Sequence, residues 1–175
     1  MKTERSETWE PATAHVPFAR FNDRSTTPRW LPQKPGITVG TPIFDQGTGT
    51  YTTLTQIVAE ELAVEADRVH LDAWDTGIVE NDAGIGGSRG TRVATAVGHA
   101  VMEETHRALL AIAAADAGRA VEEFTFGRDG VVRHGDGAVP PRSWQELLAA
   151  TGRTATGTDR ESTRLNSSHV ALSRM

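Results

Sequence analysis

"ITVGTPIFDQGTGTYTTLTQIVAEELAV" (residues 37–64) is the stretch that decides the fold. Its first part, 37–45, is short and rich in β-branched residues, which predicts a strand. A glycine-rich loop leads into 53–64, where apolar positions recur with the 3.6-residue period of a helix. Thr53, with Gln56 three residues later, predicts a capping box at the helix start. The expected buried face carries Leu54, Ile57, Val58 and Leu62.

The next segments repeat the order of strand and helix. "RVHLDAW" (68–74) alternates in polarity and predicts a second strand, and 75–90 is a long glycine-rich connection. Residues 91–118 are the longest periodic stretch and predict a helix with Gly118 as its C-cap. The expected core face of this helix carries Val93, Val97, Val101, Ala108 and Ile112.

The opposite face of that long helix carries three residues that could bind a metal. His99, Glu103 and His106 follow one another at positions i, i+4 and i+7, a spacing that can present metal ligands. No fourth ligand is evident nearby, so we expect a solvated polar face and predict no metal site.

Two shorter elements complete the pattern. "EEFTFGRDGVVRHGDG" (122–137) predicts a hairpin that turns at 128–130, and "SWQELLAA" (143–150) predicts an amphipathic helix with Ser143 as N-cap. The order of elements predicts an α/β (α+β) fold, with a mixed sheet covered by helices on one side.

The two ends of the chain differ from this pattern. Residues 1–35 are polar and punctuated by proline, and we expect a weakly ordered lead-in to a domain at 36–152. Residues 153–175 carry no core stripe, and we expect an aberrant, disordered tail. Its "STRLNSSH" resembles the stray translation found at the ends of gene fragments assembled from sequencing reads, so we expect the natural protein to continue differently from about residue 157.

Composition limits the classes of function. The 175 residues are enough for one domain with a core, and 18 Lys and Arg against 23 Asp and Glu give a net charge of −5, which argues against broad binding of nucleic acid. The chain has no cysteine, which excludes disulfides and thiolate metal sites and fits a reducing compartment. The N-terminal residues contain no signal-peptide apolar run, and no stretch is long and apolar enough to span a membrane. We expect a cytoplasmic protein that binds neither nucleic acid nor membrane.

Two clusters of glycine and hydroxyl residues precede the two predicted helices. "QGTGT" (46–50) and "GGSRGT" (86–91) place backbone N–H groups at helix N-termini, which can bind an anion such as phosphate. Arg89 adds a charged group, and Ser88, Thr91, Thr48 and Thr50 can donate hydroxyl hydrogen bonds. Neither cluster has the spacing of the dinucleotide or P-loop motifs. The alternative is two ordinary turns with good capping residues.

The sequence of these segments resembles that of one protein family. "TPIFDQGTGTYTTLTQIVAEEL", then a "WDT" strand end and "GGSRGTRVATAVGHAV", is similar to the large, molybdenum-cofactor-binding subunit of the xanthine dehydrogenase, aldehyde oxidase and carbon monoxide dehydrogenase family. The similarity covers roughly residues 36–151 and corresponds to part of the second molybdopterin-binding region. It implies that the predicted fold is part of a larger molybdopterin-binding domain.

The resemblance implies a cofactor site on the two loops. Many relatives have Gln where this chain has Thr48, which puts a side-chain amide contact in doubt at that position. The implied cofactor is molybdenum bound by molybdopterin, commonly as the cytosine dinucleotide in bacteria. The implied binding residues are Gln46, Gly47, Thr48, Gly49 and Thr50 of the first loop and Gly87, Ser88, Arg89, Gly90 and Thr91 of the second.

The resemblance also implies what the chain lacks. The parent enzymes hydroxylate aldehydes or N-heterocycles with water as the oxygen source, or oxidise carbon monoxide, and the implied partners are the remainder of the large subunit and iron–sulfur and FAD-containing subunits or domains. Their catalytic glutamate lies in a later segment with no match here, so we assign no catalytic residue and expect the isolated chain to be inactive. A stand-alone anion- or nucleotide-binding module and a ligand-free structural fragment remain alternatives.

Overall fold

In a computed structural model, the residues that the structure describes are 36–41, 45–73, 86–158 and 169–172. The chain divides into two units, Met1–Pro32 and Gln33–Met175, and every described residue lies in the second. The predicted lead-in, Trp74 and most of the predicted 75–90 loop lie outside the described residues. The helices and strands in chain order are β1 (Ile37–Thr41), α1 (Thr50–Leu62), η2 (Ala66–Arg68), β2 (Val69–Ala73), α2 (Gly90–Ala117), η3 (Val121–Glu123), β3 (Phe124–Phe126), β4 (Val131–His134), β5 (Arg142–Ser143), α3 (Trp144–Thr151), β6 (Ala155–Thr158) and β7 (His169–Leu172).

A four-stranded mixed sheet has the order β2-β1-β7-β6. β1 and β2 are parallel, as expected of two strands joined by a crossover helix, and β7 is antiparallel to both β1 and β6. Ile37 of β1 pairs with Val69 on one side and Leu172 on the other. All three side chains are buried, so the β-branched and aliphatic positions of the strands form the core face of the sheet.

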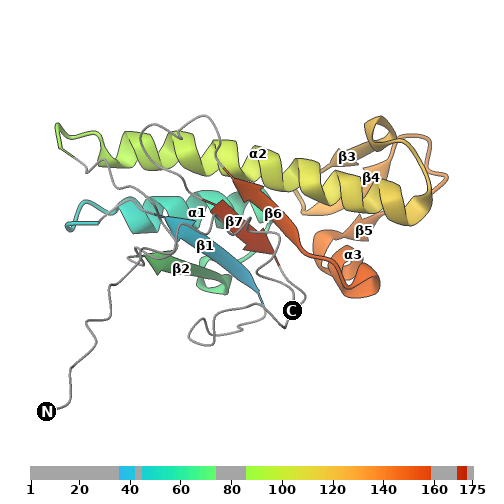
Figure 1. Ribbon diagram of the computed structural model, residues 1–175, viewed down its shortest axis with the longest axis horizontal. Helices are drawn as coiled ribbons and strands as arrows, with labels where there is room; N and C mark the ends of the chain where they lie inside the picture. The colour runs from blue at the N-terminus through green and yellow to red at the C-terminus, as the bar shows by residue number, and fades with distance from the viewer. Residues whose placement is uncertain (1–35, 42–44, 74–85, 159–168, 173–175) are drawn as a thin grey trace, which may run out of the picture. The chain divides into compact units, whose positions relative to one another are not determined.

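α1 and α2 lie side by side (Figure 1). A glycine allows their close approach: a Cβ at Gly98 of α2 would lie 3.1 Å from Cδ1 of Leu54 and 3.2 Å from Cγ2 of Ile57. Leu54, Val58 and Leu62 of α1 and Val97, Val101 and Ile112 of α2 are buried, as their spacing predicts, whereas Ile57, Val93 and Ala108 are half-buried.

A second, three-stranded antiparallel sheet, β3-β4-β5, lies by the C-terminal half of α2 with α3 (Figure 1). The turn between β3 and β4 ends at Gly130, whose φ of +72° is a left-handed conformation that glycine adopts easily. Ser143 caps α3 through a complete capping box with Glu146. The predicted hairpin, its turn, the short helix and the α/β fold class are therefore confirmed.

Two predictions at the start of α1 are wrong. The helix begins at Thr50 with Gly49 as N-cap, and Thr53 lies inside it, where its Oγ1 donates to the carbonyl oxygen of Gly49 at 3.0 Å. Thr53 and Gln56 therefore form no capping box. Asp45, predicted as the last strand residue, lies in the loop, because its carboxylate accepts the N–H groups that open the helix.

The prediction that residues 153–175 stand apart from the fold is wrong for two segments. β6 and β7 complete the four-stranded sheet, and Ala155, Val170 and Leu172 are buried in the core. Each strand has four residues, too few for a two-residue period to stand out in the sequence.

Candidate functional site

The two glycine-rich loops lie at the same end of the α1–α2 pair. Gly98 of α2 lies next to Leu54 of α1. Two turns further along α2, the ring of His106 bonds the carbonyl oxygen of Glu61 near the end of α1. The two helices therefore run in the same direction. Gly49 precedes Leu54 by five residues and Arg89 precedes Gly98 by nine. At ~1.5 Å per residue, the two N-termini are offset by only ~6 Å along the helix axes. Figure 1 shows both helices beginning at this end.

The first loop is organised by the carboxylate of Asp45. Its Oδ1 accepts the N–H groups of Gly47 and Thr48, both at 2.9 Å, and its Oδ2 accepts that of Tyr51 at 3.1 Å. The Tyr51 N–H, followed by those of Thr48, Gly47 and Gly49, holds the pKa of Asp45 below its usual value. The carboxylate therefore binds the backbone donors at the opening of α1.

The sequence prediction had missed the role of Asp45. An aspartate two residues before a glycine is the pattern of an Asx turn, in which the side chain accepts a backbone N–H two residues later. The "DQG" pattern carries this signal, but it directly follows the β-branched pattern of the predicted strand.

Two hydroxyl groups extend the Asp45 network. Thr48 Oγ1 donates to Asp45 Oδ1 at 3.4 Å and lies 2.8 Å from Thr50 Oγ1. Thr48 is exposed, whereas Thr50, the first residue of α1, is fully buried. Of these two hydroxyls, only that of Thr48 is accessible to a ligand.

The second loop has a different character. Gly87 has a φ of +73° and Ser88 a φ of +56°, and residues 86–89 are all exposed. Arg89 is the N-cap of α2, but its side chain makes no cap hydrogen bond, and the first turn contains no acidic residue. The opening of α2 therefore offers backbone donors and a positive dipole end, and no residue of its own first turn supplies a carboxylate.

The ten predicted cofactor residues thus fall at one end of the helix pair. Gln46, Gly47, Thr48, Gly87, Ser88, Arg89 and Thr91 are exposed and Gly49 is half-buried, but Thr50 and Gly90 are buried. A Cβ added at Gly47, Gly49 or Gly87 would meet no atom within 4 Å, so the backbone there is open to a ligand. Backbone donors and open backbone of this kind can bind an anionic group.

The histidines of α2 hold the two helices together. His106 Nε2 lies 3.1 Å from the carbonyl oxygen of Glu61 and stacks on Phe126, and His99 Nδ1 lies 3.1 Å from the Glu61 carboxylate. His106 is half-buried, so the predicted solvated face is wrong for this residue. Among the residues with assigned positions, no group of three or more His, Cys, Asp or Glu could hold a metal ion.

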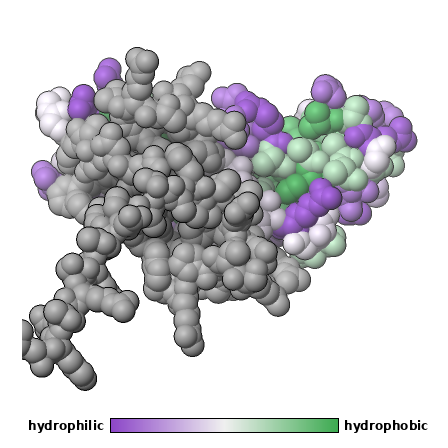
Figure 2. All heavy atoms as spheres, in the orientation of Figure 1, coloured by the Kyte–Doolittle hydropathy of each residue, from purple (hydrophilic) through white to green (hydrophobic). Residues whose placement is uncertain are grey.

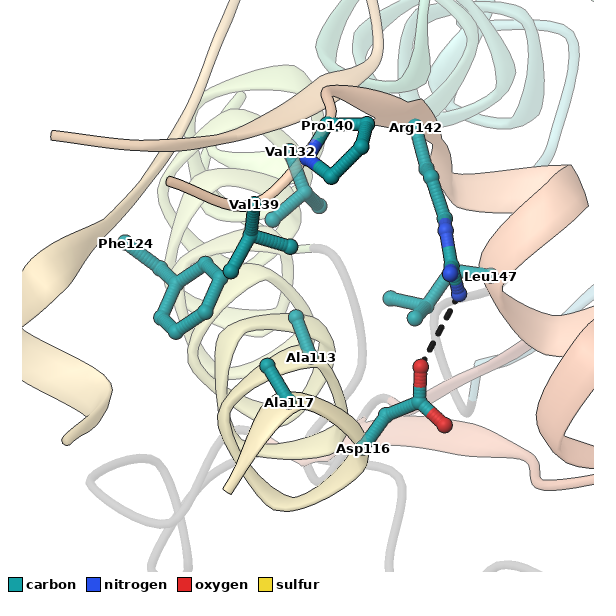
Figure 3. Close-up of a pocket in the computed structure, with 9 residues that line it drawn as sticks. All are labelled: Ala113, Asp116, Ala117, Phe124, Val132, Val139, Pro140, Arg142 and Leu147. Carbon is teal, nitrogen blue, oxygen red and sulfur yellow. Dashed lines mark hydrogen bonds and ion pairs between the residues drawn. The ribbon is translucent and has the colours of Figure 1, made fainter. Parts of the chain in front are cut away.

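A small pocket lies at the far end of α2 (Figure 3). Its cavity volume of about 20 Å³ has room for little more than a water molecule. Figure 3 shows the ion pair of Arg142 Nη1 with Asp116 Oδ2, at 2.9 Å, on one side and Phe124 and Val139 on the other. Figure 2 shows hydrophobic residues gathered over this end of the molecule, among hydrophilic ones. Ala113 follows Gly90 by 23 residues, or ~35 Å of helix, so this pocket is remote from the loops.

Comparisons with known proteins bear on the fold and the family of the chain. Residues 22–170 match the family model described as "Molybdopterin cofactor-binding domain". The chain is similar to reconstituted CO dehydrogenase from Oligotropha carboxidovorans, with 25% identity and a TM-score of 0.53 over 62% of this chain and 13% of that chain. It shares its fold with the Cu,Mo-CO dehydrogenase in the carbon monoxide reduced state, with 21% identity and a TM-score of 0.59 over 77% of this chain and 16% of that chain.

No curated protein matches the chain. The chain spans 13% and 16% of the length of the two similar structures. Within the ranges that the structure describes, no helix has the length and apolarity needed to cross a membrane.

Proposed function

Because the chain belongs to the family of molybdopterin cofactor-binding domains, as its two glycine motifs predicted, we propose that it binds a molybdenum–molybdopterin cofactor as part of a molybdenum hydroxylase large subunit. The observation that carries the proposal is the position of the two loops at one end of the α1–α2 pair, with open backbone at Gly47, Gly49 and Gly87. Such a subunit oxidises an aldehyde, an N-heterocycle or carbon monoxide, with water as the oxygen source.

The loops divide the proposed contacts between them. Gln46, Gly47, Thr48 and Gly49, with Thr50 supporting them from the helix, contact the pterin. Gly87, Ser88, Arg89, Gly90 and Thr91 contact the phosphate part, because the start of α2 combines backbone donors with the Arg89 guanidinium and lacks an acidic residue. We propose the cytosine dinucleotide form of the cofactor, whose pyrophosphate would offer two phosphate groups to the start of α2.

The cofactor would supply the redox chemistry, and this chain would position it. Three glutamates of α1 and α2 are engaged elsewhere: Glu61 bonds His99, and Glu103 and Glu104 both pair with Arg107. None of them is placed as a catalytic base at the loops. We therefore propose that the base, the iron–sulfur clusters and the flavin belong to other parts of the enzyme, and that the isolated chain has no hydroxylase activity.

Matched glycine substitutions test the proposal. Gly47, Gly87 and Gly137 have φ values of +83°, +73° and +74°, and a Cβ at each would meet no atom within 4 Å, so valine imposes similar backbone strain at all three. Gly137 follows β4, far from the loops. In the complete subunit, Gly47→Val and Gly87→Val should lower the molybdenum and pterin content, and Gly137→Val should not.

Two outcomes would contradict the proposal. Full cofactor content in all three variants would show that the loops do not contact the cofactor. An equal loss in all three would show that backbone strain alone is responsible. Binding of a free nucleotide, with no molybdenum or pterin retained, would favour the stand-alone nucleotide-binding module.

A further inference from the structure

The carboxylate of Asp45 occupies the position at the start of α1 where an anion would bind. Three backbone N–H groups, of Gly47, Thr48 and Tyr51, point at its two oxygens at 2.9–3.1 Å. Backbone donors at a helix N-terminus commonly bind phosphate in this way. At the start of α1 the anion is supplied by the chain itself.

The charge of Asp45 also determines what the neighbouring hydroxyl offers. An ionised carboxylate only accepts hydrogen bonds, so the single hydroxyl hydrogen of Thr48 is directed to Asp45 Oδ1. Either hydroxyl can donate in the 2.8 Å contact between Thr48 and Thr50. With its hydrogen directed to Asp45, the Thr48 hydroxyl has only an oxygen lone pair to offer a ligand, which is unfavourable for a phosphate oxygen.

Within the described residues 86–91, the second loop shows no such arrangement. No acidic residue lies in the first turn of α2, and the N-cap residue is Arg89. One helix start is thus closed by a resident carboxylate, whereas the first turn of its neighbour contains no acidic residue. Two helix starts of similar appearance in the sequence therefore differ in the charge they accept.

We infer that Asp45 is a specificity-determining residue that excludes anionic groups from the 46–50 loop. The inference rests on the proposed function for its role in the enzyme: Asp45 would prevent the phosphate part of the cofactor from binding at the pterin loop and so fix the direction in which the cofactor lies across the two loops.

The test uses inorganic pyrophosphate and the ¹⁵N-labelled 175-residue chain. In the unmodified chain, pyrophosphate should leave the amide signals of Gly47, Thr48 and Tyr51 unshifted. Asp45→Asn keeps the shape of the side chain without its charge, and the same amides should then shift, with an affinity at least about tenfold higher, or ~1.4 kcal/mol. Asp45→Ser, which retains a side-chain oxygen that can accept a hydrogen bond, serves as a second uncharged variant.

Shifts of these three amides in the unmodified chain would overturn the inference. So would the absence of shifts in both uncharged variants, provided that core amides such as that of Val58 show them to be folded. The amides of Gly90 and Thr91 at the start of α2 report separately on the proposed function: if they do not respond to pyrophosphate, the proposed phosphate contact fails while the result at Asp45 stands.

Discussion

The indole Nε1 of Trp144 donates a hydrogen bond of 3.0 Å to the carbonyl oxygen of Leu62, the last residue of α1. Both residues are fully buried and lie 82 positions apart in the chain. The backbone of Gly130 packs against both residues. Its carbonyl oxygen accepts the N–H of Trp144, and a Cβ at Gly130 would lie 2.9 Å from the Leu62 oxygen. The contact joins α1, the hairpin and α3, and it gives the last carbonyl of α1 a partner.

We predict that Trp144→Phe destabilises the chain by about 2–4 kcal/mol. The substitution leaves the buried Leu62 carbonyl without its donor and leaves a cavity where the indole was. The measurement is the free energy of unfolding in urea. Gln145→Ala, a substitution in the same turn of α3 at a half-buried position, should cost no more than about 0.5 kcal/mol. Equal stability of the two variants would contradict the role assigned to Trp144.

The sequence predicted the elements whose signals are local. Ser143 and Glu146 form the expected capping box, and Gly118 adopts the left-handed conformation expected of a C-cap. The contact of Trp144 with Leu62 and that of His106 with Glu61 join residues 82 and 45 positions apart, and no pattern within one helix could reveal them.

The start of α1 shows why the candidate site was predicted only in part. The sequence contained two competing start signals, the Thr53–Gln56 spacing and the "DQG" turn. Asp45 accepts three backbone N–H groups, more than one capping threonine could, and the helix therefore begins three residues before Thr53. The position of both loops at one end depends on the packing of α1 on α2, which the sequence pattern does not encode.

Gly157→Ala should destabilise the chain by about 1–3 kcal/mol or more, because β6 packs directly on α2. A Cβ at Gly157 would lie 2.2 Å from the carbonyl oxygen of Val101 and 2.7 Å from the backbone nitrogen of Thr105. Gly135→Ala is the matched control, since its Cβ would meet only Glu123 O, at 3.5 Å. The midpoint of thermal unfolding compares the two. If Gly157→Ala unfolds at the same temperature as the control, β6 does not pack on α2.

The side chain of His134 is 1% exposed and lies between two carboxylates, Glu123 at 2.7 Å from Nε2 and Asp136 at Nδ1. The hydrogen bond with His134 is the largest cause of the lowered pKa of Glu123. The pKa of Asp136 is lowered mainly by the N–H of Ala138 and further by His134. A carboxyl group with a lowered pKa in the folded state stabilises the fold at pH values above its unfolded pKa. That stability is lost as the pH falls through the lower folded pKa.

Glu123→Gln should therefore flatten the fall of the unfolding free energy with decreasing pH below about 4.5, the ordinary pKa of glutamate. The measurement is a set of urea unfolding curves between pH 7 and pH 2.5, roughly the range over which carboxylates titrate. Glu122→Gln, at the exposed neighbouring position, should show the same pH dependence of the unfolding free energy as the unmodified chain. Identical pH profiles for the two variants would show that the bond to His134 contributes nothing.

The last prediction concerns Arg89, which is exposed at the N-cap of α2. In the complete subunit, Arg89→Ala should lower the affinity for the molybdopterin dinucleotide roughly ten- to a hundredfold, as expected for the loss of a charge-assisted contact of ~1.5–3 kcal/mol. Because the residue is exposed, the unfolding free energy of the cofactor-free protein should change by no more than about 0.5 kcal/mol.

Two further variants separate charge from geometry at this position. Arg89→Lys keeps the charge but cannot form the paired hydrogen bonds of a guanidinium, so its cofactor content should lie between those of the unmodified protein and Arg89→Ala. Arg153→Ala removes an exposed arginine after α3 and should leave the cofactor content unchanged. The measurements are molybdenum and pterin per subunit, beside an unfolding curve of the cofactor-free form. Unchanged occupancy together with a large loss of stability in Arg89→Ala would make "GGSRGT" a structural turn and remove the phosphate contact from the proposed site.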